Sequence, residues 1–367
     1  MTWRFVPKGD IQHCGYELNC NPFVWFVGAL ILEPLTLSSP LALIDTIVAP
    51  EDFLTEYPLG GDFYRAAGSD EIPGFDFGYL VAHRNSVREA VVPYFVTDFK
   101  FNTMLDEGWL KHAMGNIGLR IACVGHPCAP FGRIEGAFST ELLECVFAKL
   151  KTRASVVAMK GFGPDLPTQD FVRVAGLPVA VLQLRKNFWD TLKSHRRNDF
   201  KRKLKAASGL RFEVVEGLPE RYLEQVYRLY LNTYAKANVR FECLSSTYFS
   251  ATAHLSNYLL AFLDEQMVGF IQIIRKGYSM VAFYMGLDYA VDRKLGVYFA
   301  MHLHAVDFAI ASNCSELEVG ETNYMFKKNL GCDLINTWVY YRHRNWFTNL
   351  LLARFAFLLA PSEKELR

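Results

Sequence analysis

The stretch 279–311 decides the fold and reads SMVAFYMGLDYAVDRKLGVYFAMHLHAVDFAIA. Its first part, 279–287, is rich in aromatic and apolar residues and predicts a strand. A charged loop over 288–296 leads into a helix predicted over 297–311. The start of a helix offers unpaired backbone N–H groups and the positive end of the helix dipole. This layout therefore predicts a phosphate-binding site at the start of the helix.

The order of elements around this stretch occurs twice along the chain, as hairpins that lead into a strand–loop–helix–strand unit. In the first half we expect strands over 77–83, 89–99, 119–125 and 155–160, a loop over 125–136 and a helix over 137–151. In the second half we expect further strands over 258–263, 267–274, 317–319 and 337–342 and a helix over 323–329. Glycines and prolines interrupt the pattern over 161–178. The sequence therefore predicts an α/β protein of mixed α+β character, with domains 1–175 and 176–367.

The composition narrows the class of protein. The chain has 367 residues, of which 51% are hydrophobic and 21% charged, and this excludes a disordered protein. Lys and Arg number 39 against 38 Asp and Glu, so no global charge indicates a nucleic-acid or membrane partner. Any basic partner surface must be local.

The cysteines and the apolar segments bear on metal binding and location. None of the 8 cysteines forms a CxxC pair or a Cys/His cluster with zinc spacing, so we expect no metal site. Thiols in a chain this long are typical of a reducing, cytoplasmic environment. The first residues lack the order of a signal peptide, and the apolar run 23–32 is shorter than the about 20 residues of a membrane span. A soluble cytoplasmic protein with no transmembrane segment is expected.

Three segments carry a resemblance to a known family. The run Arg293-Lys294-Leu295-Gly296-Val297-Tyr298 is similar to the pyrophosphate-binding pattern of GNAT acyltransferases, except that Tyr298 replaces a small residue. The segments 189–203 and 320–331 resemble the BioF2-like acetyltransferase domain, a relative of the Fem ligases, which transfer aminoacyl groups from tRNA. The resemblance covers about residues 180–345, and the first half matches in layout.

The resemblance implies two tandem GNAT-like domains, of which the N-terminal one is degenerate and shapes the acceptor site. It also implies acyl-CoA or aminoacyl-tRNA as co-substrate, with no tightly bound cofactor. The loop 125–132, at the position of a second pyrophosphate loop, contains Pro127 and Pro130, which lack the N–H groups that bind anions. Cys128 near His126 shows no third orienting group, so a Cys–His nucleophile is disfavoured.

The donor site is predicted around the start of the 297–311 helix. Charged side chains would add to the helix dipole, and Gly296 would let the backbone approach the ligand closely. Arg196 falls on the apolar stripe of the basic helix 189–206, where a guanidinium needs an anion or carbonyl groups. The alternatives are a solvated loop, and an Arg196 that ties down loop carbonyls or a core carboxylate. The predicted donor-binding residues are Arg293, Lys294, Gly296, Val297, Arg196 and Tyr284.

The outward side of the same basic helix predicts a phosphate-binding ridge. Arg197, Lys201 and Lys205 lie there at helical spacing and could hold phosphates of coenzyme A or tRNA. A solvated helix face is the alternative.

The catalytic residues are predicted on the segment 321–327. An amine that attacks an ester or thioester carbonyl needs a base, a proton donor for the leaving group and stabilisation of the oxyanion. Glu321 and Tyr324 could serve as base and donor, and Lys327 could stabilise the developing negative charge. The Gly-x-x-x-Tyr-x-x-Lys-x-x-x-Gly spacing of the relatives makes Lys327 the strongest of these candidates. The alternative is a helix cap with Lys327 on the surface. Glu242 is a further candidate to meet the amine.

The apolar tail 346–359 predicts a helix that packs on the N-terminal half, with peripheral membrane contact or partner docking as the alternative. Taken together, the sequence predicts an N-acyltransferase that joins an activated acyl group to an amine-bearing small molecule by direct attack, without metal. An aminoacyl-tRNA-dependent Fem-type ligase and a non-catalytic binding module remain alternatives.

Overall fold

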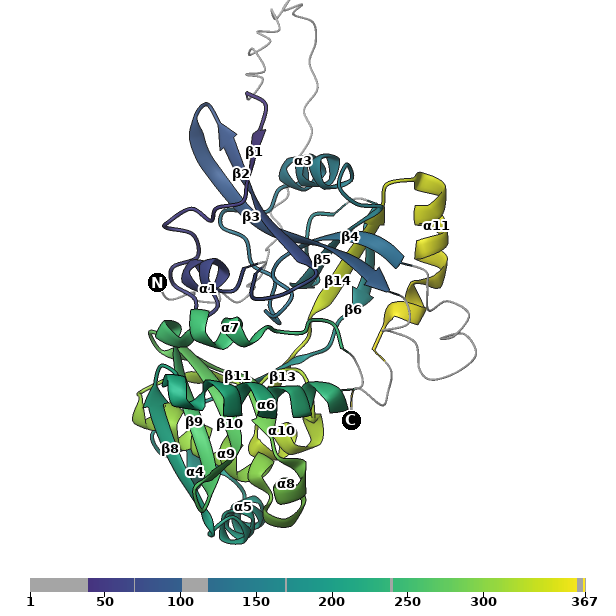
Figure 1. Cartoon of the computed structure of the whole chain (residues 1–367). Helices are drawn as coiled ribbons and strands as arrows, with labels where there is room; N and C mark the ends of the chain where they lie inside the picture. Colours follow the sequence, from purple (N-terminus) through teal and green to yellow (C-terminus); the bar gives the residue numbers. More distant parts are fainter. Residues whose placement is uncertain are drawn as a thin grey trace, which may run out of the picture. The chain divides into compact units, whose positions relative to one another are not determined.

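Figure 1 shows the computed structural model of the chain. The structure describes residues 39–361, apart from 69, 101–117, 169 and 238–239, together with residue 366. Residues 40–367 form one compact unit. The described residues build two sheets of 7 strands each, so the predicted α/β fold is confirmed.

The first sheet has the strand order β1-β2-β3-β4-β5-β14-β6. Only β4 and β5 pair in parallel among these neighbours. Helix α3 (Thr140–Leu150) begins at Ser139, whose hydroxyl caps it, and buries one apolar face. The strands are β1 (Ala42–Thr46), β2 (Phe75–Arg84), β3 (Val87–Lys100), β4 (Gly118–Val124), β5 (Val156–Phe162), β6 (Val172–Ala175) and β14 (Trp338–His343), and a short helix α1 (Gly61–Ala66) follows β1.

The second sheet has the strand order β13-β7-β12-β11-β10-β9-β8. Its strands are β7 (Val179–Gln183), β8 (Leu210–Glu216), β9 (Ser256–Leu263), β10 (Gln266–Lys276), β11 (Ser279–Leu287), β12 (Glu316–Glu318) and β13 (Asp333–Ile335). The helices of this half are α4 (Phe188–Thr191), α5 (Ser194–Ala206), α6 (Glu220–Lys236), α7 (Ser246–Ala251), η2 (Ala253–Leu255), α8 (Tyr289–Leu295), α9 (Val297–Ala311) and α10 (Tyr324–Leu330). The chain ends with α11 (Trp346–Phe355) and η3 (Ala356–Leu359).

Two local predictions are wrong. The strand expected over 337–342 is β14, which lies between β5 and β6 in the first sheet and thus outside the half to which sequence order assigned it. The expected loop 288–296 is the helix α8, because Asp288 caps its N-terminus and Gly296, at φ 65°, ends it in the left-handed region.

The helices α6 and α9 cover opposite faces of the second sheet (Figure 1). On β10, Phe270 packs with the α6 side and Ile271 with the α9 side, as strand alternation requires. α6 comes so close to β11 that a Cβ on Gly286 would lie 2.6 Å from the backbone of Leu229 and Tyr230. The close approach therefore depends on glycine at this position.

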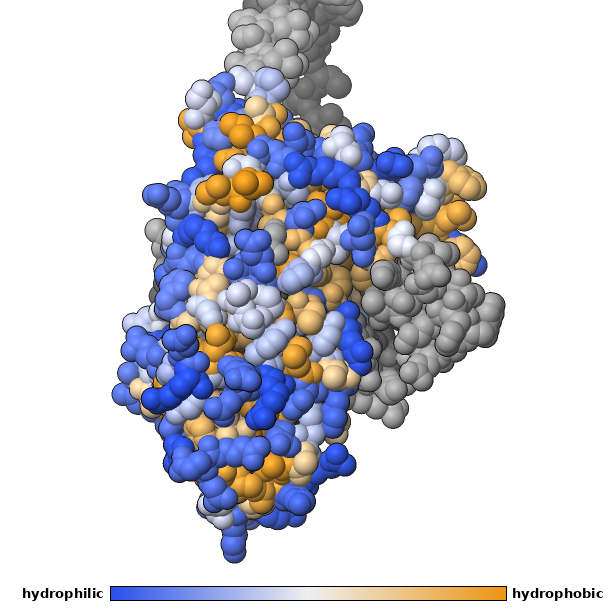
Figure 2. All heavy atoms as spheres, viewed as in Figure 1, coloured by the Kyte–Doolittle hydropathy of each residue, from blue (hydrophilic) through white to orange (hydrophobic). Residues whose placement is uncertain are grey.

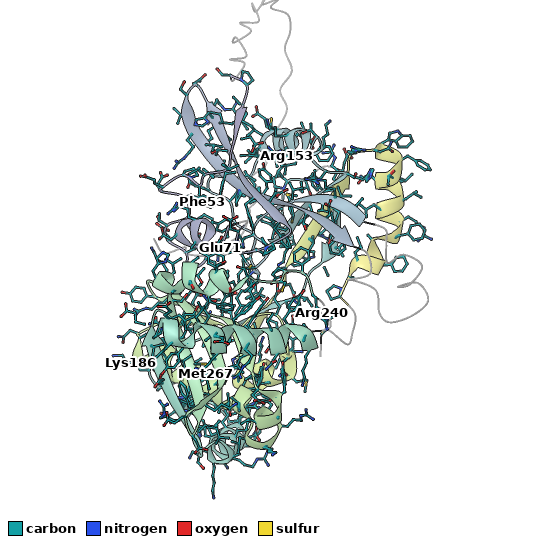
Figure 3. The ribbon with its side chains drawn as sticks, in the orientation of Figure 1. Phe53, Glu71, Arg153, Lys186, Arg240 and Met267 are labelled. Carbon is teal, nitrogen blue, oxygen red and sulfur yellow. The ribbon has the colours of Figure 1, made fainter. Side chains whose placement is uncertain are left out.

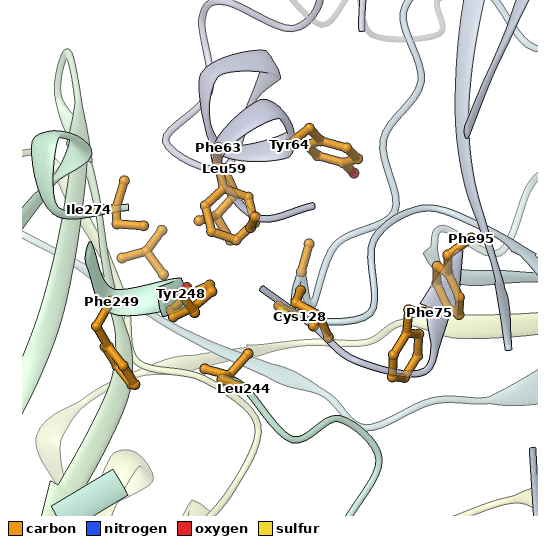
Figure 4. Packing of buried hydrophobic residues seen from close by; sticks show 14 of the residues in the cluster. Leu59, Phe63, Tyr64, Phe75, Phe95, Cys128, Leu244, Tyr248, Phe249 and Ile274 are labelled. Atoms are coloured by element: carbon orange, nitrogen blue, oxygen red, sulfur yellow. The ribbon is translucent and has the colours of Figure 1, made fainter. Parts of the chain in front are cut away.

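One hydrophobic cluster joins the two halves of the unit. It brings Phe63 of α1 together with Tyr248 and Phe249 of α7, and Cys128 lies beside them (Figure 4). A backbone hydrogen bond from Ser245 N to the carbonyl of Glu71, 2.9 Å long, crosses between the halves as well; Glu71 is labelled in Figure 3. The inner faces of both halves are thus buried against each other.

Helix α11 lies against β14 and β6 of the first sheet, but none of its residues is fully buried, so the packing expected for the apolar tail is only partial. Several of its large side chains still face solvent, among them Trp346, which is 77% exposed, and Leu350, which is 60% exposed. Figure 2 shows apolar residues, in orange, at the surface where α11 lies. Among the helices of the described residues, none has both the length and the apolar character needed to cross a bilayer.

The close packing of α6 gives a stability prediction. Gly286→Ala places a methyl group against backbone atoms that cannot move aside, and overpacking of this kind costs about 1–3 kcal/mol. Gly209→Ala is the matched control, since a Cβ there meets no atom within 4 Å. We expect a lower urea midpoint for Gly286→Ala and none of that loss for Gly209→Ala; equal midpoints would contradict the packing described.

Candidate active site

The strands β11 and β12 part in the middle of the second sheet. They pair in parallel over three positions, Ser279–Glu316, Met280–Leu317 and Val281–Glu318. β12 ends there, while β11 runs on to Leu287, and among the described residues no strand pairs with that edge of β11 beyond Val281. The backbone groups of this edge are thus available to a ligand that lies between the parted strands.

Lys327 lies beside the point where the strands part. The chain leaves β12 through Gly320, at φ 79°, and a Cβ on that glycine would lie 3.8 Å from Nζ of Lys327. The residue is only 2% exposed, and within the described residues its ammonium makes no hydrogen bond. Burial lowers the pKa of Lys327 to about 8, against the opposing effect of Glu321 and Glu318. The surface position offered as the alternative is therefore wrong.

Two carboxylates accompany this lysine. Burial raises the pKa of Glu321, which Lys160 of β5 and Lys327 hold down in part. Burial, with the nearby Glu321, raises the pKa of Glu318 to about 7. Oε1 of Glu318 is buried and has no hydrogen-bond partner among the described residues. Sequence analysis missed Glu318, although the alternation Glu316-Leu317-Glu318 on a short strand between apolar neighbours could have indicated it.

Tyr324 opens α10 and is 1% exposed. Its hydroxyl donates a 2.8 Å hydrogen bond to the carbonyl of Pro178, at the junction between the two halves. The same helix carries Lys327 one turn later, so this bond fixes the position of the lysine.

His302 is a second buried group on this side. It projects from α9, its ring centroid 4.6 Å from that of Tyr298 and 5.5 Å from that of Phe326. Burial, with the nearby Lys327 ammonium, lowers the pKa of His302 to about 3, so the ring is neutral. Its Nδ1 is buried and lacks a partner among the described residues.

The start of α9 is already occupied by a carboxylate of this chain. Oδ1 of Asp292 accepts a 2.7 Å hydrogen bond from the backbone N–H of Tyr298. This is one of the N-terminal amides that would otherwise bind an anion. Gly296 adopts the left-handed conformation here, and the side chain of Val297 is fully buried in the core.

The predicted donor-binding cations differ in how far they are exposed to solvent. Arg293 and Lys294 are exposed in the last turn of α8, and Nε of Arg293 donates to the carbonyl of Tyr289 at 3.2 Å. Arg196 is partly buried, and its Nε is buried without a hydrogen-bond partner among the described residues. Arg196 thus remains able to bind an anion.

The ridge on α5 is smaller than predicted. Arg197 is partly buried and donates to the carbonyls of Asp190 and Leu192, at 2.9 and 3.0 Å, so its outward position was wrong. It ties down the end of α4, the task offered as an alternative for its neighbour Arg196. Lys201 and Lys205 are exposed as predicted.

Tyr284 lies on the α6 side of β11 rather than at the start of α9. Its hydroxyl donates a 2.9 Å hydrogen bond to Glu242, which comes from the segment between α6 and α7. Burial raises the pKa of Glu242, an effect that the Lys160 charge and this hydrogen bond oppose. The structure therefore groups Tyr284 with Glu242 and Lys160, and not with the donor-binding cations.

A cavity of about 370 Å³ lies on this inner face of the second sheet. Strands β7, β11 and β12 form one wall, from which Glu316 and Glu318 contribute, and first-half segments around Tyr57 and Arg133 form the other. No cluster of His, Cys, Asp and Glu suited to a metal ion occurs among the described residues.

The comparisons with known proteins agree with this fold. Residues 193–328 match the family model of the GNAT acetyltransferase domain. A search of curated proteins finds no match.

Among solved structures, L-PGS from Bacillus licheniformis has 11% identity and a TM-score of 0.50, over 85% of this chain and 98% of that one. A tandem GNAT protein from the clavulanic acid biosynthesis pathway has 9% identity and a TM-score of 0.49, over 83% of this chain and 99% of that one. FemX has 10% identity and a TM-score of 0.48, over 76% of this chain and 91% of that one.

The family match falls on the half that contains α5, the parted strands, the α8–α9 junction and Lys327. The first sheet adds a second α/β layer with the same kind of hairpins and a parallel pair. Residues 193–328 thus carry a GNAT acetyltransferase domain, and the two seven-stranded α/β sheets agree with the predicted pair of tandem GNAT-like domains.

Proposed function

We propose that the protein is an N-acyltransferase that forms an amide by direct attack of an amine on an activated acyl group. The observation that carries the proposal is the parting of β11 and β12 beside the buried ammonium of Lys327. An acyl group held between the strands would bring its carbonyl to that ammonium. A buried, unpaired positive charge is a strong stabiliser of an oxyanion, because little water competes for it.

The proposed reaction uses the two carboxylates as bases. Glu318, or its neighbour Glu321, takes a proton from the ammonium form of the acceptor, and the neutral amine then attacks the carbonyl carbon. The tetrahedral oxyanion is stabilised by Lys327. The bond to the leaving group then breaks, and the proton held by the carboxylate passes to the departing thiol or hydroxyl. The freed carboxylate takes the excess proton that remains on the nitrogen, which leaves the neutral amide, and releases that proton to solvent. Tyr324 positions Lys327, because its hydroxyl is bonded to Pro178.

Two donors are candidates, and one observation separates them. Acyl-CoA would place its pyrophosphate at the start of α9, where Arg196, Arg293 and Lys294 would add positive charge. The Asp292 carboxylate on Tyr298 N–H opposes a pyrophosphate there and favours the second candidate, an aminoacyl ester of tRNA. In that case Lys201 and Lys205 would contact the tRNA backbone.

The first prediction concerns Lys327. Lys327→Met should lower kcat/KM by about 10²–10³-fold, the usual loss when an oxyanion donor is removed. The melting temperature should stay the same or rise, because a buried unpaired charge destabilises the fold. Lys328→Met, on the exposed neighbour, should change neither quantity. Full activity of Lys327→Met would remove the lysine from the mechanism.

The second prediction concerns pH. Glu318 acts as a base only when deprotonated, above its pKa of about 7, and Lys327 is charged only below its pKa of about 8. The plot of kcat/KM against pH should therefore rise through about pH 7 and fall above about pH 8. Glu318→Gln should abolish the acidic limb in the residual activity. A profile that is flat over this range would contradict both assignments.

The third prediction separates the donors. If acyl-CoA is the donor, Asp292→Asn keeps the cap on Tyr298 but removes its charge, and KM for acyl-CoA should fall several-fold. If aminoacyl-tRNA is the donor, Asp292→Asn should leave KM unchanged. Lys201→Glu with Lys205→Glu should then weaken binding, and activity should fall steeply with added salt. Thermal shifts with acetyl-CoA, longer acyl-CoA esters and charged tRNA provide an independent readout.

A further inference from the structure

The cavity between the two halves has a wall with two neighbouring carboxylates. Glu316 and Glu318 are two residues apart on β12, so both project from the same face of the strand into the cavity. Leu317, between them, points to the opposite face and packs with the α9 side. Glu56, an exposed residue of the opposite wall, adds a third carboxylate.

One cation balances part of this charge. The described lining contains three carboxylates and a single guanidinium, that of Arg133. Arg133 stacks on the ring of Tyr57, with 3.8 Å between its central carbon and the ring centroid. No salt bridge joins it to a carboxylate within the described residues, so the lining keeps an excess of negative charge.

The two carboxylates on β12 differ in their hydrogen bonds. Glu316 accepts a hydrogen bond from the hydroxyl of Ser279. Glu318 accepts none from the part of the chain that the structure describes, and its Oε1 is buried beside the cavity. A buried carboxylate without a partner costs free energy, and a donor that enters the cavity would relieve that cost. The cavity thus favours a ligand whose polar group donates hydrogen bonds and carries a positive charge.

The remaining lining is largely apolar. It includes Leu59, Pro130, Val281 and Ile335, which suit a chain of methylene groups. The volume of about 370 Å³ lies within the range of small-molecule sites.

We infer that this cavity binds a linear aliphatic diamine as the acceptor, with one ammonium at Glu318 and the second at Glu316 or Glu56. The inference rests on the proposed acyl transfer and specifies its acceptor. The ammonium at Glu318 lies next to the group around Lys327, where it would be deprotonated and acylated. The second ammonium anchors the molecule through charge, and the methylene chain contacts the apolar wall. Neutral and anionic acceptors would leave the carboxylates unpaired, so the cavity discriminates against them.

The test is isothermal titration calorimetry on the full chain, without any acyl donor. The probes are 1,4-diaminobutane and butylamine, which share the carbon chain and differ in one ammonium group. We expect the diamine to bind at least tenfold more tightly. Glu318→Gln should weaken its binding at least tenfold and Glu316→Gln several-fold. Glu224→Gln, an exposed carboxylate on α6, is the matched control and should bind as the unchanged protein does.

The outcomes separate this inference from the proposed function. Equal affinities for the two amines, or a Glu318→Gln variant that binds the diamine as well as Glu224→Gln does, would overturn the diamine site. If Glu318→Gln failed to fold, the comparison of the two amines and Glu316→Gln would still decide. Tight diamine binding without turnover by any acyl donor would uphold the site and count against acyl transfer. Acyl transfer to neutral amines without diamine binding would support the acyl transfer and overturn the diamine site.

Discussion

An ammonium group inside a protein costs free energy unless charges or hydrogen bonds surround it, and the centre of the second sheet is arranged around that constraint. Lys327 has carboxylates nearby but no hydrogen bond to any described residue. The glycine turn after β12 leaves room for Nζ, and the bond from Tyr324 to Pro178 holds α10 in place. The fold thus keeps a positive charge where a ligand can use it, at a cost in stability that the apolar packing of α10 offsets.

In the proposed reaction, the second sheet also separates the two substrates. Its α9 side carries Arg196, which is proposed to bind the donor, whereas its inner side faces the acidic cavity. β12 is the shared boundary, because its alternate residues point to opposite sides. In the proposed reaction, an anionic donor and a cationic acceptor would approach from opposite faces and meet at Lys327. Because the donor and the acceptor carry opposite charges, each would be disfavoured at the binding site of the other.

The sequence predicted the helices and strands better than the contacts between them. The helices expected over 297–311 and 323–329 correspond to α9 and α10, and the family resemblance pointed to Lys327. The wrong predictions depended on contacts distant in the sequence. Helical spacing places Arg196 and Arg197 on adjacent positions, but it cannot tell which of them reaches the carbonyls at the end of α4. Nor could the helical spacing show that the carboxylate of Asp292, on α8, accepts a hydrogen bond from the backbone of the next helix, α9.

The position of β14 governs the order in which this chain can fold. The sheet neighbour of β6 is β14, a strand made after the whole second sheet has been synthesised. On the ribosome, β5 therefore waits with an open edge while about 175 further residues emerge, and an open edge is prone to pairing with other chains. The two halves cannot fold one after the other, because the first sheet is completed only when β14 is added. The two halves are thus joined in assembly through this one strand.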